Sequence, residues 1–275
     1  MTGKWLAIPV ALAIAFTPVA ASAQVCGIGI IVAAMVANAQ QQRELTQTEA
    51  ASCGLMLNQD QKNVRAKKSA RLIGDGNGLI WDIGGGMGEG WSDFVAMSLL
   101  YNDNAFDPNA EYASGAYATY QLGGLTDNYL YGIRRFPYST DNTVNPLTWA
   151  DVDDWTYNQA GGIAPSPLGF EFNGALEVHN VGEIWANSLW EVRSRVIADP
   201  AGANGDVPTG NATMLQLVVD GLKQTPINPS FVDARDALID ADCSTNACAN
   251  EASIWGGFAD RGLGYGAVAP LGQVG

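Results

Sequence analysis

Two carboxylates suited to metal chemistry, Glu89 and Asp93, lie four residues apart in the stretch GGGMGEGWSDF at residues 84–94. Side chains four residues apart share one face of a helix, and the apolar residues that follow predict that a helix starts near Glu89. One carboxylate can bind zinc, and a second one turn later can orient a histidine that binds the same ion. The glycines before Glu89 would allow another segment of backbone to come close. Because this spacing is common by chance, it does not establish a site by itself.

The chain has one histidine, His179, at the start of the segment with the clearest helical periodicity. Glu183 follows four residues later, on the same face of the expected helix. His179 could hydrogen-bond to a developing oxyanion, act as an acid or base, or bind a metal together with Glu183. A lone histidine is more often a structural group, and the spacing does not decide among these roles.

The segment YGIRRFPYSTD, residues 131–141, places Arg134 and Arg135 close to Tyr138. Two arginines beside aromatic residues can bind a carboxylate or a peptide backbone. They can equally hold a loop against an acidic domain, which is the interpretation we favour. The acidic run DVDD at 151–154 lacks the spacing of a calcium-binding helix–loop–helix site, so we expect a solvated loop there.

Cysteines occur at four positions, namely Cys26, Cys53, Cys243 and Cys248. If the chain is exported to an oxidising compartment, Cys243 and Cys248 can close a small loop as a disulfide. A zinc site is not expected from these two residues, because their spacing is loose and no further cysteine or histidine lies nearby.

The elements that would position these residues are mainly helices. Helical spacing of apolar residues, prolines near the expected helix ends and Gly262 at the last one predict five of them. The segment GNA, residues 210–212, is the expected cap region of the third helix, and Pro229 is expected in the first turn of the fourth. Residues 102–178 are rich in loop-forming residues. The predicted helices span residues 89–101, 178–198, 213–224, 229–242 and 251–262.

The N-terminal part differs in composition from the rest. Residues 1–23 have the pattern of a signal peptide, which would extend to residue 39 if cleavage follows the second apolar run. That run, residues 25–39, is otherwise a candidate for membrane contact. Residues 24–80 form a polar, basic arm around it, and we place a domain boundary at about residue 80. The chain is therefore expected to be secreted, to an extracellular or periplasmic location.

Charge changes at the same boundary. The formal net charge is −14, but residues 1–80 carry a net +3 and residues 81–275 a net −17. The basic run KNVRAKKSAR, residues 62–71, is interpreted as a solvated face, with an anionic lipid surface as the alternative. An acidic body of this kind repels nucleic acid, so no nucleic-acid partner is expected.

Several long motifs occur in one order: GGMGEGWSDF, YGIRRFPYSTD, EVHNVGEIWANSLWEV, LQLVVDGLKQTPINPSFVDARDALIDAD and IWGGFADRGLG. Together they resemble the C-terminal half of the catalytic domain of fungalysins, which are secreted zinc metalloendopeptidases with a thermolysin-like fold. The resemblance covers about residues 83–265. It implies a mainly α fold, the helical C-terminal lobe of a thermolysin-like zincin, with residues 81–275 as a partial peptidase domain.

The resemblance also implies roles for single residues. Glu89 matches the third zinc ligand of the family, and Asp93 matches the carboxylate that steadies a zinc-bound histidine. His179 matches the catalytic histidine that stabilises the oxyanion of the tetrahedral intermediate. Arg134, Arg135 and Tyr138 match a family motif that we take as a candidate substrate-binding segment. The implied cofactor is zinc, and the implied partner is a peptide or protein substrate.

The family also needs an upstream HExxH helix, which provides two zinc-binding histidines and the glutamate that activates water. The chain contains no HExxH, because its one histidine is His179. We therefore expect a truncated zinc metalloendopeptidase that is inactive alone. The alternatives are an exported peptide-binding module without catalysis, or a gene fragment without function.

Overall fold

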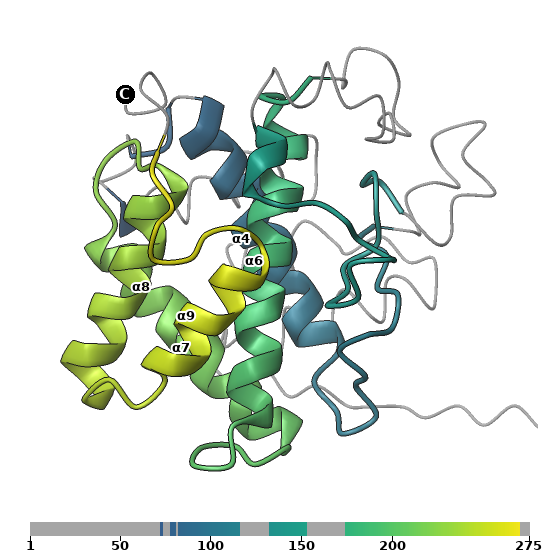
Figure 1. The fold of residues 1–275 in the computed structure, drawn as a ribbon, viewed down its shortest axis with the longest axis vertical. Helices are drawn as coiled ribbons and strands as arrows, with labels where there is room; N and C mark the ends of the chain where they lie inside the picture. The colour runs from purple at the N-terminus through teal and green to yellow at the C-terminus, as the bar shows by residue number, and fades with distance from the viewer. Residues whose placement is uncertain (1–71, 74–77, 81, 116–131, 153–173, 270–275) are drawn as a thin grey trace, which may run out of the picture.

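The computed structural model describes residues 72–73, 78–80, 82–115, 132–152 and 174–269, and this part of the chain is built from helices (Figure 1). The predicted mainly α fold is therefore confirmed, and no β-strand occurs among these residues. The predicted signal peptide, the apolar run 25–39 and the basic run 62–71 lie outside the described residues. No helix in the described ranges combines the length and the apolar character needed to cross a bilayer.

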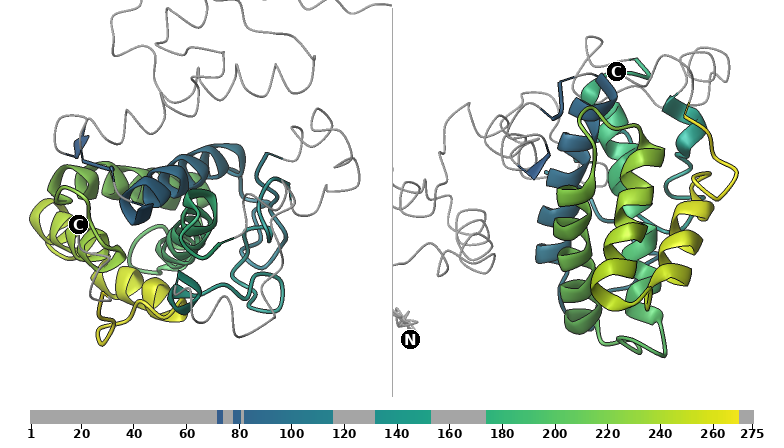
Figure 2. Two further views of the ribbon diagram at one scale, coloured as in Figure 1. Left: turned by 90° about the horizontal axis from the view of Figure 1, so that it is seen from above. Right: turned by 90° about the vertical axis from the view of Figure 1, so that its left-hand side faces the viewer.

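The helix α6, Val178–Ala198, lies at the centre of the helical body. Its bounds agree with the sequence prediction. It packs against α4, Asp82–Leu100, and against α9, Glu251–Asp260. These two neighbours lie on opposite sides of α6 (Figure 2). As a result, α6 is buried along most of its length and connects the two sides of the molecule.

The prediction that a helix starts near Glu89 is wrong, because α4 begins at Asp82 and Glu89 lies in its third turn. Glycine lowers helix propensity, but here it allows α4 and α6 to approach closely. A Cβ added to Gly90 would lie 2.4 Å from the carbonyl oxygen of Gly182, and one added to Gly182 would lie 2.7 Å from the oxygen of Gly86. The packing against α6 therefore outweighs the poor propensity of the glycine-rich first turns.

Aromatic side chains join the helices at the centre of the core. The Trp185 ring, on α6, lies 5.5 Å from the ring of Trp91 on α4 and 4.9 Å from that of Phe231. It also stacks on Phe258 of α9. All four side chains are buried. Edge-to-face and offset pairs of this kind add to the free energy gained by burying the rings.

The next helix, α7, spans Val207–Gln224 and starts six residues before its predicted position. Its cap is Asp206, whose carboxylate accepts a hydrogen bond from the amide of Thr209. Pro208 occupies the first turn, where its missing N–H is not needed. The segment GNA, the expected cap region, lies inside the helix.

The helix α8 spans Phe231–Asn246 and extends four residues past its predicted end. Ser230 and Asp233 form a reciprocal capping box, so Pro229 lies just before the cap rather than inside the helix. The last helix, α9, ends at Asp260, two residues before the predicted end. Gly262 follows it with a φ of +80°, a conformation that glycine adopts without strain.

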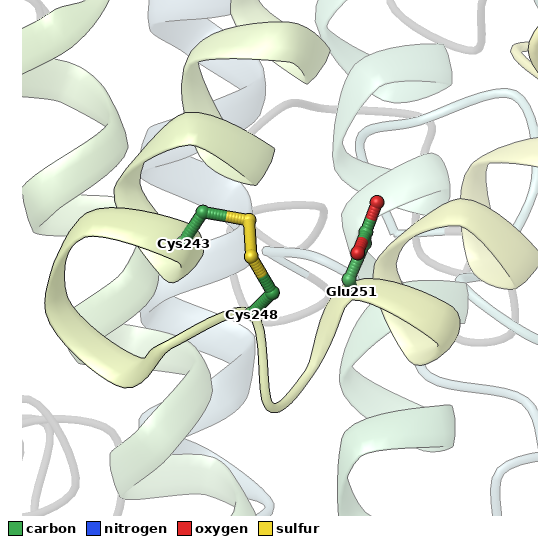
Figure 3. Close-up of side chains that lie close together, drawn as sticks. All are labelled: Cys243, Cys248 and Glu251. Atoms are coloured by element: carbon green, nitrogen blue, oxygen red, sulfur yellow. A yellow bond between two sulfur atoms is a disulfide. The ribbon is translucent and has the colours of Figure 1, made fainter.

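The predicted disulfide between Cys243 and Cys248 is confirmed. It joins the end of α8 to the turn before α9, with Glu251 close by (Figure 3). The bond fixes the connection between these two helices.

The loop segments after α4 also pack against α6, because the rings of Tyr112 and Tyr138 lie near that of Trp190. Tyr112 and Tyr138 exchange two backbone hydrogen bonds, which pair the segment before residue 115 with the segment after residue 132. Arg261 also holds the segment after residue 132, because its guanidinium donates hydrogen bonds to the carbonyl oxygens of Ser139 and Leu147. A 3-10 turn, Trp149–Val152, ends this segment.

Candidate active site

Glu89 and Asp93 lie one turn apart on α4, as the spacing predicted. Their environments differ. The Asp93 side chain is buried, whereas 19% of the Glu89 side chain is exposed. The two carboxylates therefore differ in environment, and the neighbours of each carboxylate decide what it can do.

Asp93 is held by two residues of the segment 131–141. Arg134 Nε donates a hydrogen bond of 2.6 Å to Asp93 Oδ2, and the Tyr138 hydroxyl donates another of 2.6 Å to the same oxygen. Burial alone would raise the pKa of Asp93, but the Arg134 charge and these hydrogen bonds hold the pKa below its ordinary value. Burial and the Asp93 charge raise the pKa of Tyr138 well above its ordinary value, so its hydroxyl stays protonated and continues to donate.

Glu183 of α6 fixes the position of the segment that carries Arg134 and Tyr138. One of its carboxylate oxygens accepts hydrogen bonds from the Nε and the backbone N–H of Arg135, and the other accepts from the backbone N–H of Phe136. Both side chains of the Glu183–Arg135 pair are fully buried. The interpretation that the two arginines hold a loop against the acidic body is thus confirmed for Arg135, and this anchor places Arg134 next to Asp93.

Because Glu183 is engaged by Arg135 and Phe136, the alternative in which His179 and Glu183 bind a metal together has no geometric support. His179 interacts instead with Glu177, the cap of α6, whose Oε1 lies 2.6 Å from His179 Nδ1. The other Glu177 oxygen accepts the backbone N–H groups of His179 and Asn180. One carboxylate therefore caps the helix and orients the imidazole.

Glu177 was not predicted as a site residue. Burial would raise its pKa, but the hydrogen bonds and charge of His179 and the Asn180 amide together lower it. A Glu two residues before a helix-starting histidine is the signal that could have identified it, since an acidic group is favoured at a helix N-terminus.

The imidazole of His179 and the carboxylate of Glu89 come together beside this network. His179 Nε2 lies 3.7 Å from Glu89 Oε2, and Arg134 Nη2 lies 3.9 Å from the same oxygen. Nitrogen atoms of Arg134 and His179, from two different segments, thus converge on one oxygen of the partly exposed Glu89 side chain. Such an arrangement can bind a cation through Glu89 and can donate to an oxygen atom of a ligand through His179 or Arg134.

A catalytic zinc ion needs three protein ligands and a water. Among the described residues, the one cluster of three potential metal-binding groups is Cys243, Cys248 and Glu251, and its two sulfurs are joined in the disulfide (Figure 3). Around Glu89 the described residues do not supply a set of three. They therefore do not fit a complete catalytic zinc site.

The model of the fungalysin metallopeptidase family, M36, matches residues 67–267. The chain belongs to this family. The match begins upstream of the boundary that we placed at residue 80, and it contains every residue of the fungalysin site described above.

Curated relatives agree with this assignment. The extracellular metalloproteinase mep of Aspergillus niger is 38% identical over 192 residues, which cover 67% of this chain and 26% of that protein. Extracellular metalloproteinase 9 of Uncinocarpus reesii is 38% identical over 192 residues, 66% of this chain and 26% of its own length. Extracellular metalloproteinase 1 of Trichophyton equinum is 37% identical over 191 residues, with the same two shares. The chain thus spans about a quarter of the length of these relatives.

Proposed function

We propose that this chain provides the helical lobe of an exported zinc metalloendopeptidase that hydrolyses peptide bonds of extracellular proteins, and that it is inactive alone. The family and the names of the relatives support a metalloproteinase. The convergence of Glu89, His179 and Arg134 on one partly exposed position is the structural observation that supports it most.

In this proposal each residue has one task. Glu89 contributes one metal ligand, and the ion would polarise the peptide carbonyl when a complete site binds it. His179, oriented by Glu177, donates from Nε2 to the oxyanion that develops at the substrate carbonyl. Asp93 is the residue that would steady a metal-binding histidine, while Arg134 and Tyr138 hold its carboxylate in place.

The same residues explain why the chain alone should not turn over. Glu89 is a single ligand, and its Oε2 already lies near one nitrogen atom of Arg134 and one of His179. The residue that would activate water, the glutamate of HExxH, has no counterpart in the sequence. An HExxH helix from outside this sequence would have to complete the site.

The test is a cleavage assay on casein with the purified full chain and added zinc. We expect no chelator-sensitive cleavage from the chain alone, and cleavage once a separately expressed fungalysin N-terminal half with HExxH is added. Glu89→Ala in this chain should abolish the restored cleavage, whereas Glu111→Gln, an exposed carboxylate in the loop after α4, should not. Cleavage by the chain alone that Glu89→Ala removes would contradict the proposed inactivity.

A second candidate function, peptide capture without catalysis, is favoured by one observation. Arg134 is 3% exposed, and its Nη1 has no hydrogen-bond partner among the described residues. A peptide carbonyl that reached this buried nitrogen would supply the missing acceptor. Calorimetry with a broad pool of peptides would show no heat if this function is absent, and heat that is reduced in Arg134→Lys if it is present, because lysine lacks the planar fork.

Export rests on the predicted signal peptide and on relatives that are named extracellular. These names favour an extracellular over a periplasmic destination. N-terminal sequencing of the protein recovered from culture medium tests this part. We expect the mature chain to start after Ala23 or Ala39, and retention of Met1 in the medium would contradict signal cleavage.

A further inference from the structure

A second candidate binding region lies between α8 and α9, and α9 is on the opposite side of α6 from α4. It is a groove of about 560 Å³ between α8, Trp255 of α9 and the segment that follows α9. No residue of the proposed peptidase site lines it. The residues that matter for its chemistry are Arg235, Asp236, Asp240, Trp255 and Tyr265.

The aromatic wall of the groove is exposed to solvent at Tyr265. Tyr265 is 90% exposed, the largest exposure of any large hydrophobic residue in the described ranges. Its ring lies 5.9 Å from that of Trp255, so it extends an aromatic surface that starts on α9. An exposed tyrosine ring next to a tryptophan offers an aromatic face that a ligand can cover.

The charged wall is formed by α8. Asp236 and Asp240 lie one turn apart, on the same face, and both are exposed. Asp240 makes no hydrogen bond or ion pair with any described residue. Asp236 binds Arg235, with 2.7 Å between Arg235 Nη2 and Asp236 Oδ1.

Arg235 does not make the groove basic. It is 3% exposed, and its guanidinium donates to the carbonyl oxygens of Leu263 and Gly264 in addition to Asp236. One face of the guanidinium lies over the Trp255 ring, 4.7 Å from the centroid. The arginine therefore fixes the segment after α9 and the aromatic wall, and its charge is neutralised by Asp236. Asp240 is therefore the carboxylate of the groove that has no cationic partner among the described residues.

We propose that this groove binds a lysine or arginine side chain of a peptide, with the cation between Asp240 and the Tyr265 ring. An aromatic face attracts a cation through its quadrupole, and a carboxylate beside it adds Coulomb attraction. An anionic ligand would be repelled by Asp240 and by the net charge of −17 over residues 81–275. A purely apolar ligand would bury Asp240 without a partner, which is costly.

The experiment is calorimetric titration of the full chain with a capped peptide that carries two lysines. The matched ligand has both lysines replaced by norleucine, which keeps the apolar stem and removes the charge. We expect the lysine peptide to bind and the norleucine peptide to bind at least tenfold more weakly. Tyr265→Ala and Asp240→Asn should each weaken binding about threefold, and together about tenfold.

Glu111→Gln is the control variant, because it also removes one exposed carboxylate but lies in the loop after α4. It should leave the affinity unchanged if the groove is the site. Equal weakening by Glu111→Gln would show unspecific attraction to an acidic protein and would overturn the proposal. Equal binding of the norleucine peptide, or no heat at millimolar lysine peptide, would overturn it too. Since Asp240 and Tyr265 are exposed, the folded state should tolerate both variants.

Discussion

Arg134 Nε and Asp93 Oδ2 are 2.6 Å apart, and both side chains are buried. This contact joins α4 to the segment 131–141 and leaves Glu89 as the partly exposed carboxylate on the same helix face. It therefore separates the two acidic residues into a structural carboxylate and a candidate metal ligand. Removing either partner would leave an uncompensated charge in the interior.

Asp93→Asn should destabilise the fold by about 3 kcal/mol, because it leaves the Arg134 guanidinium buried without its counter-ion. Urea unfolding followed by circular dichroism measures the change. The matched control is Asp260→Asn, which breaks the exposed contact between Arg195 and Asp260 and should cost at most about 1 kcal/mol. Equal effects of the two variants would show that burial of the Asp93 contact is energetically unimportant.

Gly90→Ala should destabilise the protein by about 2 kcal/mol, since its Cβ would lie 2.4 Å from the carbonyl oxygen of Gly182. Gly85→Ala, on the same helix, meets nothing closer than 3.6 Å and should stabilise it by about 0.5 kcal/mol through better helix propensity. Urea unfolding of both variants tests the close packing of α4 on α6. Opposite signs are expected, and a neutral Gly90→Ala would contradict the helix–helix distance.

Lowering the pH should destabilise the fold as Asp93 and Glu177 become protonated. Both have folded-state pKa values below their unfolded values of 3.8 and 4.5. Their stabilisation is therefore fully present above these unfolded values and is lost as pH falls through the folded values. Thermal melts between pH 6 and pH 2.5 should show a falling Tm below about pH 4.5.

Glu177→Gln should flatten part of this acid dependence, because glutamine does not titrate. The variant should also change the NMR signals of the His179 ring, which are the only histidine signals of the protein. An unchanged acid slope together with unchanged ring signals would contradict the contact between Glu177 and His179.

Replacing Cys243 and Cys248 together by serine should cost about 2 kcal/mol, since their disulfide closes a short loop in the unfolded chain. The double variant should lose the sensitivity of its stability to a dithiol reductant. A variant that is as stable as the parent, or a parent that resists reductant without any change in Tm, would contradict a stabilising bond.

Much of the fold could be predicted from apolar spacing and from residues at helix ends. The bounds of α6 were correct because its periodicity is regular and Glu177 ends the preceding loop. The start of α4 was missed because glycine is a poor helix former, and only the position of α6 explains why glycines occur there. The start of α7 differs from the prediction because Gly210 suggests a cap, while Asp206 and Pro208 are the stronger signal for a helix start.

The candidate site was predicted in part. The shared face of Glu89 and Asp93 follows from helix geometry, and the pairing of Cys243 with Cys248 follows from their short spacing. The partners of the arginines could not be predicted, because Arg134 and Asp93 are separated by 41 residues and Arg135 and Glu183 by 48. Contacts over such distances depend on how the helices pack, and local sequence patterns do not encode this directly.

We propose that this chain of the fungalysin family offers one metal ligand, Glu89, and that its described residues do not complete a zinc site. The most direct test is the zinc content of the purified full chain after equilibration with zinc and gel filtration in metal-free buffer. The account predicts far less than one zinc per chain, with the same low content in Glu89→Ala. One tightly held zinc per chain that Glu89→Ala removes would contradict it.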